Sequence, residues 1–144
     1  MTAYLLDTNL LIPLLWPRHT EQTKVRAWFK ANAEAAFATC SLTQAGFLRI
    51  TSSPESMREK YSLVKARELL FALTKEAGHR FWPTTIDVFE ATARFESRMQ
   101  GAKQITDAYL LAIAIHHKGK LATMDRAILH LAGPEFAKHV ELIA

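Results

Sequence analysis

Short apolar runs alternate with helix-like segments along the whole chain, and this alternation restricts the possible folds more than any other feature. The runs predicted as strands cover residues 3–7, 37–40, 80–83, 121–124 and 139–143. Helical periodicity and capping residues occupy the segments between them. Strands that alternate with helices form a parallel sheet covered on both faces. We therefore expect an α/β domain of three layers, α/β/α, with a central parallel sheet of four to five strands.

The helices are expected over residues 9–16, 20–32, 54–77, 87–99 and 126–131. Another helix should start at a cap formed by Ser41 or Thr43 and run to about residue 51. Thr106 is expected to cap an apolar helix that ends near residue 119. The long helix over 54–77, closed by Gly78, should bury an apolar face. That face is predicted to include Tyr61, Val64, Leu69, Phe71 and Leu73.

Size and composition limit the class of protein. A chain of 144 residues is expected to form a single domain, residues 1–144, with a core that needs no disulfides. Its one cysteine, Cys40, lies in an apolar run and is interpreted as a buried side chain in a reducing cytoplasm. We find neither a secretory signal nor an apolar run of membrane-spanning length. The net charge of +4 permits nucleic-acid binding without indicating it.

Three aspartates occupy comparable places along the chain. Asp7, Asp107 and Asp125 each stand beside an apolar run, where a predicted strand ends or a helix begins. In a parallel sheet these places gather at the carboxyl edge, where ligands bind. Carboxylates brought together repel one another, and hard divalent cations with oxygen ligands relieve that repulsion. The pattern predicts a site for Mg²⁺ or Mn²⁺ held by these three side chains.

Each aspartate alone also has a purely structural interpretation. Asp7 fits an Asx turn after a strand or a helix cap. Asp107 in a first helical turn complements the helix dipole, and Asp125 suits a cap for residues 126–131. Because all three fall on the same predicted edge, a shared metal site explains them better than three separate caps.

Four segments in register resemble the PIN-domain ribonucleases, in particular the VapC-type toxins of bacterial toxin–antitoxin pairs. The segments are Leu5-Leu6-Asp7-Thr8-Asn9, Ser41 to Ile50, Gln104-Ile105-Thr106-Asp107 and Ala122-Thr123-Met124-Asp125-Arg126. Each is weak alone, but four in register make a strong signal, and the resemblance extends from residue 3 to residue 140. The resemblance implies a PIN-like fold and a Mg²⁺- or Mn²⁺-dependent endoribonuclease toxin that cleaves structured RNA such as tRNA or rRNA. It also implies a VapB-like antitoxin as partner and a homodimer.

The resemblance also assigns roles to side chains around the three aspartates. Asp7, Asp107 and Asp125 would bind the metal and carry catalysis. Thr8, Asn9, Thr106 and Thr123 would position waters or phosphate oxygens around it, although Asn9 and Thr123 fit ordinary turns equally well. Arg49 and Arg126 are the candidates for contacts with RNA phosphates, with a solvated helix surface as the alternative.

Position 44 departs from the family pattern. VapC-like proteins usually have a glutamate there as a fourth catalytic acid, and this chain has Gln44. Glutamine keeps the length and one acceptor oxygen but loses the negative charge. Natural tolerance, natural loss of activity and a deliberate inactivating change remain open as explanations. The alternative function is therefore a weakened or inactive PIN module that binds RNA or the antitoxin.

Two other phosphoryl-transfer classes fit poorly. Phosphatases of the haloacid dehalogenase type need a second aspartate two positions after the first, where this chain has Asn9. Receiver domains need a pair of acids near the first strand and a late lysine, and neither is visible.

Overall fold

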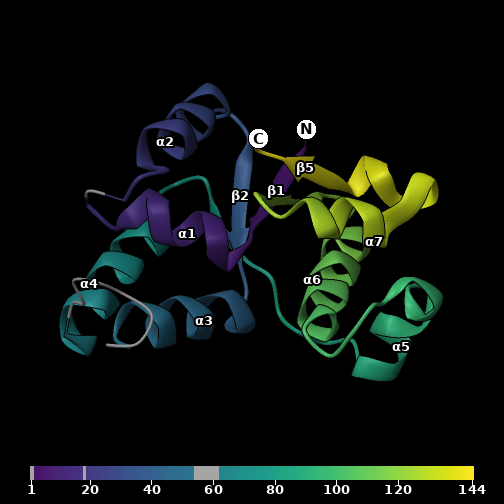
Figure 1. Ribbon diagram of the computed structural model, residues 1–144. Coiled ribbons are helices and arrows are strands. Elements are labelled where there is room, and N and C mark those ends of the chain that lie inside the picture. Colours follow the sequence, from purple (N-terminus) through teal and green to yellow (C-terminus); the bar gives the residue numbers. More distant parts are fainter. Residues whose placement is uncertain (1, 18, 54–61) are drawn as a thin grey trace.

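The computed structural model describes residues 2–17, 19–53 and 62–144, and its centre is a five-stranded parallel sheet (Figure 1). The strand order is β3-β2-β1-β4-β5. The strands are β1 (Ala3–Leu6), β2 (Ala36–Thr39), β3 (His79–Phe81), β4 (Lys120–Thr123) and β5 (Val140–Leu142). All four pairings are parallel. This confirms the expected α/β/α architecture and its central parallel sheet.

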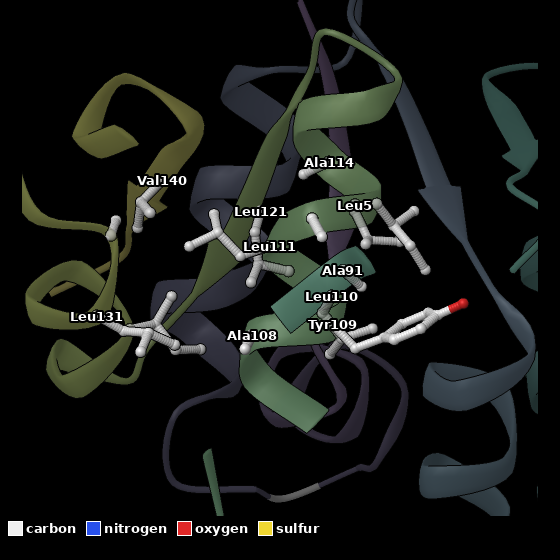
Figure 2. Packing of buried hydrophobic residues seen from close by; sticks show 14 of the residues in the cluster. Leu5, Ala91, Ala108, Tyr109, Leu110, Leu111, Ala114, Leu121, Leu131 and Val140 are labelled. Atoms are coloured by element: carbon white, nitrogen blue, oxygen red, sulfur yellow. The ribbon is translucent and has the colours of Figure 1, made fainter. Parts of the chain in front are cut away.

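Neighbouring residues of each strand point to opposite sides of the sheet, so apolar side chains lie on both of its faces. Helices cover both faces. Leu5 and Leu121 belong to one apolar cluster, shared with α5, α6 and α7, and Figure 2 shows Leu5, Leu111 and Leu121 side by side there. Leu6 and Ala122 belong to a second cluster, shared with α1 to α4. The helices are α1 (Thr8–Leu15), α2 (Gln22–Ala31), α3 (Ser41–Thr51), α4 (Leu63–Thr74), α5 (Val88–Ala93), α6 (Gln104–His116) and α7 (Arg126–Phe136). Cys40 is fully buried, as expected.

Two helix starts differ from the sequence expectation. Helix α3 begins at Ser41 with Cys40 as its N-cap, and the Thr43 hydroxyl accepts from the Cys40 backbone N–H at 3.1 Å. Thr43 therefore completes the cap from inside the first turn. Helix α6 begins at Gln104 with Lys103 as its N-cap, so Thr106 is an exposed first-turn residue and no cap.

The long helix expected over residues 54–77 is confirmed over α4, but its predicted end at residue 77 is wrong. Its predicted start and Tyr61 lie outside the described residues. Ser62 is an extended N-cap whose hydroxyl accepts from the Lys65 N–H at 3.2 Å, and α4 ends at Thr74. The predicted apolar face is correct at Leu73, which is buried, and wrong at Val64 and Phe71, which are exposed. Ala66, Leu70 and Leu73 are the residues that α4 buries.

The helix expected over residues 87–99 divides into α5 and a separate 3-10 turn over Glu96–Arg98. Asp87 caps α5 by accepting from the Glu90 N–H at 2.8 Å. Helix α7 runs beyond its predicted end at residue 131 but has a kink at Gly133, whose φ is +64°. None of the helices in the described ranges is long and apolar enough to cross a membrane.

The carboxyl ends of β1, β2 and β4 lie together at one edge of the sheet. Leu6 pairs with Ala122, and the Asp7 N–H donates to the Ala122 carbonyl at 3.0 Å. Asp7 therefore lies beside Thr123, the last residue of β4. The first residues of α1 and α3 follow at this same edge (Figure 1).

Candidate active site

Asp7 is a buried carboxylate whose oxygens are both engaged. It is 7% exposed. One oxygen accepts from the Thr8 N–H at 2.7 Å, which caps α1, and the other accepts from the Thr123 hydroxyl at 2.8 Å. Burial raises the pKa of Asp7, the hydrogen bonds from Thr123 and Thr8 oppose this effect, and the charge of Asp125 adds to it. The side chain is thus both a helix cap and part of an acidic group.

The hydroxyl of Thr123 joins three of the predicted site residues. It donates to Asp7 and accepts from the Asn9 side-chain amide at 3.1 Å and the Asp125 N–H at 3.0 Å. Asn9 in turn accepts from the Met124 N–H at 3.2 Å. With one donor and two acceptor positions in use, this hydroxyl has no further capacity. It fixes Asp7, Asn9 and the start of the Asp125 loop relative to one another.

Asp107 faces the same acidic group from α6. It is half-buried and lies in the first turn of that helix. Burial, followed by the charges of Asp7 and Asp125, raises the pKa of Asp107 from 3.8 to about 6. Asp7 and Asp107, which are one hundred residues apart in sequence, therefore act on one another across the sheet edge.

Asp125 also has a structural task, since its carboxylate accepts from the Ala127 N–H at 2.9 Å and caps α7. The caps predicted for Asp7 and Asp125 are thus real, and they coexist with the electrostatic coupling. Neither interpretation excludes the other.

Gln44 is held by a different set of partners. Its side-chain amide donates to the Thr39 hydroxyl at 3.0 Å, and Thr39 is 2.7 Å from Nε2 of His79. Thr39 is fully buried at the end of β2. Sequence reasoning missed both Thr39 and His79, because nothing in the spacing of either residue signals the contact.

The remaining predicted residues lie at different distances from the acidic group. Thr8 opens α1 directly after Asp7, while Thr106 is exposed one residue before Asp107. Arg126 is exposed at the start of α7, next to Asp125. Arg49 is exposed in the last turn of α3, so about 12 Å of helix separates it from the sheet edge.

The three aspartates offer the hard oxygen donors that Mg²⁺ and Mn²⁺ prefer. Their mutual effect on pKa places them within electrostatic reach of one another. Within the described ranges, however, no three His, Cys, Asp or Glu side chains stand close enough together to hold an ion as they are. The chemistry of the donors fits a divalent cation, and ligation would require the side chains to draw together.

Comparisons with known proteins identify the family. The family model described as "PIN domain" matches residues 4–134. Ribonuclease VapC44 of Mycobacterium tuberculosis is 37% identical over 134 residues, which cover 93% of this chain and 94% of that protein. Ribonuclease VapC38 of the same species is 35% identical over 139 residues, or 96% of each chain.

Solved structures share the fold at low sequence identity. A toxin–antitoxin complex from Klebsiella pneumoniae superposes with a TM-score of 0.66 at 18% identity, covering 98% of both chains. VapBC2 from Rickettsia felis, bound to a DNA fragment from its promoter, gives 0.65 at 14% identity over 99% of this chain and 100% of the other.

Proposed function

Since this chain belongs to the PIN-domain family and is related to VapC ribonucleases over nearly its whole length, we propose that it is an endoribonuclease toxin dependent on Mg²⁺ or Mn²⁺. The observation that carries the proposal is that the Thr123 hydroxyl donates to Asp7 and accepts from the Asp125 N–H, which brings two of the aspartates together at the sheet edge. Burial and the charges of these two aspartates raise the pKa of Asp107. Perturbed carboxylates that converge at the ligand-binding edge of a parallel sheet are typical of a functional site.

Asp7, Asp107 and Asp125 are the residues that would hold the cation. When bound, such a cation polarises a phosphodiester and lowers the pKa of a water molecule. The chain's own contribution is to hold the carboxylates in place. Thr123 fixes the Asp7 carboxylate, and Asn9 fixes the loop that leads to Asp125. A proton on Asp107 competes with the cation, so binding should strengthen as pH rises through about 6.

The proposed substrate is structured RNA, such as tRNA or rRNA, cut in a single-stranded stretch. Arg126, exposed next to Asp125, is placed to contact a phosphate near the acidic group. Arg49 would contact a phosphate farther along the strand. A net charge of +4 supports a polyanionic ligand without specifying it.

RNA cleavage tests the proposed function directly. Purified protein should cleave tRNA or rRNA with Mn²⁺ present, stop when EDTA is added, and resume when Mn²⁺ is restored. Changing Asp125→Asn keeps the α7 cap, because asparagine caps a helix about as well as aspartate. Cleavage by this variant at the wild-type rate would contradict the proposal.

The proposed partners are a VapB-like antitoxin and a second copy of the chain. The related folds from Klebsiella pneumoniae and Rickettsia felis are toxin–antitoxin assemblies by their descriptions, which supports the antitoxin. Light scattering of purified protein should give the mass of a homodimer. A monomer at every accessible concentration would contradict the dimer but not the ribonuclease.

A second candidate function rests on Gln44. Its side-chain amide donates a hydrogen bond to the Thr39 hydroxyl. A carboxylate at position 44 could not donate this bond. This hydrogen bond supports glutamine as the residue that the fold accommodates at position 44. The protein would then act as a weakened or inactive PIN module that binds RNA or the antitoxin. RNA binding without any Mn²⁺-dependent cleavage would favour this function over the first.

A further inference from the structure

A small pocket lies where the N-terminal parts of α3, α5 and α6 meet, and we call it the rim pocket. Its volume is about 280 Å³. Helices α3, α5 and α6 supply its walls through their first turns, together with the loop after β3. The lining residues are Leu42, Thr84, Val88, Ile105, Thr106 and Tyr109.

Its position relates it to the acidic group. Thr106 lines the pocket and is the neighbour of Asp107 in the first turn of α6. Tyr109, one turn further on, extends sideways from α6 in Figure 2, and its hydroxyl donates to the Ile86 carbonyl in the loop before α5. The pocket and Asp107 therefore share the N-terminal end of α6.

The walls are apolar side chains that remain open to solvent. Leu42 is 40% exposed, Ile105 46% and Val88 50%. Three solvated aliphatic side chains from three different helices make a surface that gains from being covered. Thr84 and Thr106 add hydroxyl groups at its border, which can donate or accept hydrogen bonds.

This combination fits one flat, weakly polar group. The volume lies just below the range of pockets that enclose drug-sized ligands, so one ring system suits it better than a peptide segment. RNA-binding proteins take up unpaired bases in such surroundings, between apolar side chains and with hydrogen bonds to the base edge.

We propose that the rim pocket binds an unpaired nucleobase of the RNA substrate, next to the phosphate that reaches the aspartates. The proposal rests on the ribonuclease function above and extends it to substrate choice. A base held here would favour unpaired over paired RNA, because a paired base must first break its pairing and stacking before it can enter the pocket.

Methyl NMR tests the pocket without any need for catalysis. Metal-free protein would be titrated with adenosine, cytidine and uridine, up to the solubility limit of each, with ribose as the base-free control. Uncharged nucleosides avoid repulsion by the carboxylates. The methyl signals of Leu42, Val88 and Ile105 should shift with at least one nucleoside and not with ribose. Those of Leu63 and Val64 on α4, which are exposed but outside the pocket, should stay unchanged.

Three outcomes would overturn the proposal. The first is no shift of the pocket methyls, and the second is an equal response on α4. The third is a shift of the pocket methyl signals that depends on protein concentration but not on added nucleoside. That result would indicate that a second copy of the chain covers this face.

Paired variants connect the pocket to RNA cleavage. Ile105→Ala removes one wall, whereas Leu129→Ala removes a comparably exposed aliphatic side chain from α7. We expect Ile105→Ala to lower kcat/KM for RNA about tenfold and Leu129→Ala to leave it nearly unchanged. Equal rates for both variants would overturn the substrate role. If wild-type protein binds nucleosides but cleaves no RNA, the ribonuclease function fails and the substrate role fails with it, whereas cleavage without nucleoside binding removes only the rim pocket.

Discussion

At the scale of single residues, the Thr123 hydroxyl determines how Asp7 responds to substitution. It already accepts two hydrogen bonds and gives its one hydrogen to Asp7. An asparagine at position 7 would turn its amide N–H₂ toward either this saturated hydroxyl or the Thr8 N–H. One hydrogen bond is lost in both orientations. Asp107 has no such constraint among its described contacts, so its charge can be removed more simply.

We predict that Asp107→Asn stabilises the metal-free protein, and that the gain depends on pH. The pKa of Asp107 is raised to about 6, so the folded state binds the proton more tightly than the unfolded state, and stability falls as pH rises from about 4 to 6. Above pH 6 the variant should melt roughly 2–4 °C higher than wild type in EDTA, since Asp107 is partly solvated and the relieved repulsion is about 1 kcal/mol.

Below pH 4 the melting temperatures of wild type and Asp107→Asn should converge, because both side chains are then neutral. Asp7→Asn serves as the comparison and should show little or no gain, because it also breaks the Thr123 contact. A variant at position 107 that is less stable than wild type at neutral pH would indicate that the aspartate acts chiefly as a helix-dipole partner.

Gln44→Glu should tighten Mn²⁺ binding and raise the rate of RNA cleavage tenfold or more, which requires about 1.4 kcal/mol from the added charge. The structure adds a spectroscopic consequence. A carboxylate must accept from the Thr39 hydroxyl, so Nε2 of His79 would have to donate to Thr39 instead. The pKa of His79, which burial lowers in the wild type, should therefore rise in the variant.

The exposed Gln100→Glu change adds the same charge outside the site and serves as the control for Gln44→Glu. Metal titration, RNA cleavage and an NMR titration of His79 would be compared among the three proteins. Unchanged affinity and rate with a shifted His79 pKa would mean that position 44 contacts Thr39 without taking part in metal binding.

At the scale of elements, Gly46 allows α3 to approach the start of α1. A Cβ atom at this position would lie 2.7 Å from the Thr8 hydroxyl oxygen. Gly46→Ala should therefore destabilise the fold by about 1–2 kcal/mol, because the cost of overpacking exceeds the gain in helix propensity. Denaturant unfolding measures this change in the free energy of unfolding.

The double variant Thr8→Ala, Gly46→Ala tests the cause of that loss. Without the Thr8 hydroxyl and methyl groups, the new Cβ would meet only a Cβ atom at 3.6 Å, an ordinary contact. The double variant should be more stable than the sum of the single changes predicts. Strict additivity would place the strain elsewhere.

Elements that follow from one local signal could be predicted from sequence, whereas those that depend on packing could not. Strands β1 and β4 are short apolar runs, and α2 has apolar residues at helical spacing. Each of these is a clear local pattern. The face of α4 could not be chosen in this way, because it has apolar residues on several sides. Leu70 and Leu73 are covered by α3 and the sheet, while Val64 and Phe71 are left exposed.

The candidate site shows the same division. Asp7 and Asp125 follow strands and cap helices, so their places at the sheet edge could be predicted from chain order alone. The network from Gln44 through Thr39 to His79 could not, because it joins the ends of three elements through single side chains. Sequence periodicity has no pattern for such contacts.

At the scale of the whole molecule, the sheet topology brings the aspartates together. Because β4 crosses over to pair with β1, residues 7 and 123 become neighbours, and the N-terminus of α6 brings Asp107 to the same edge. Helices on both faces bury the strands (Figure 1). The fold thereby brings together negative charges that lie on separate elements. A divalent cation would neutralise them.

The most direct test of this account is Mn²⁺ binding, measured by the loss of the free-ion EPR signal in wild type and in four single variants. Asp7→Asn, Asp107→Asn and Asp125→Asn should each weaken binding tenfold or more, about 1.4 kcal/mol per side chain. Asp87→Asn changes the one aspartate of the chain that lies outside the proposed site, an exposed cap of α5. This variant should bind Mn²⁺ like the wild type. If all four variants bind Mn²⁺ as the wild type does, the three aspartates are helix caps and dipole partners and do not form a metal site.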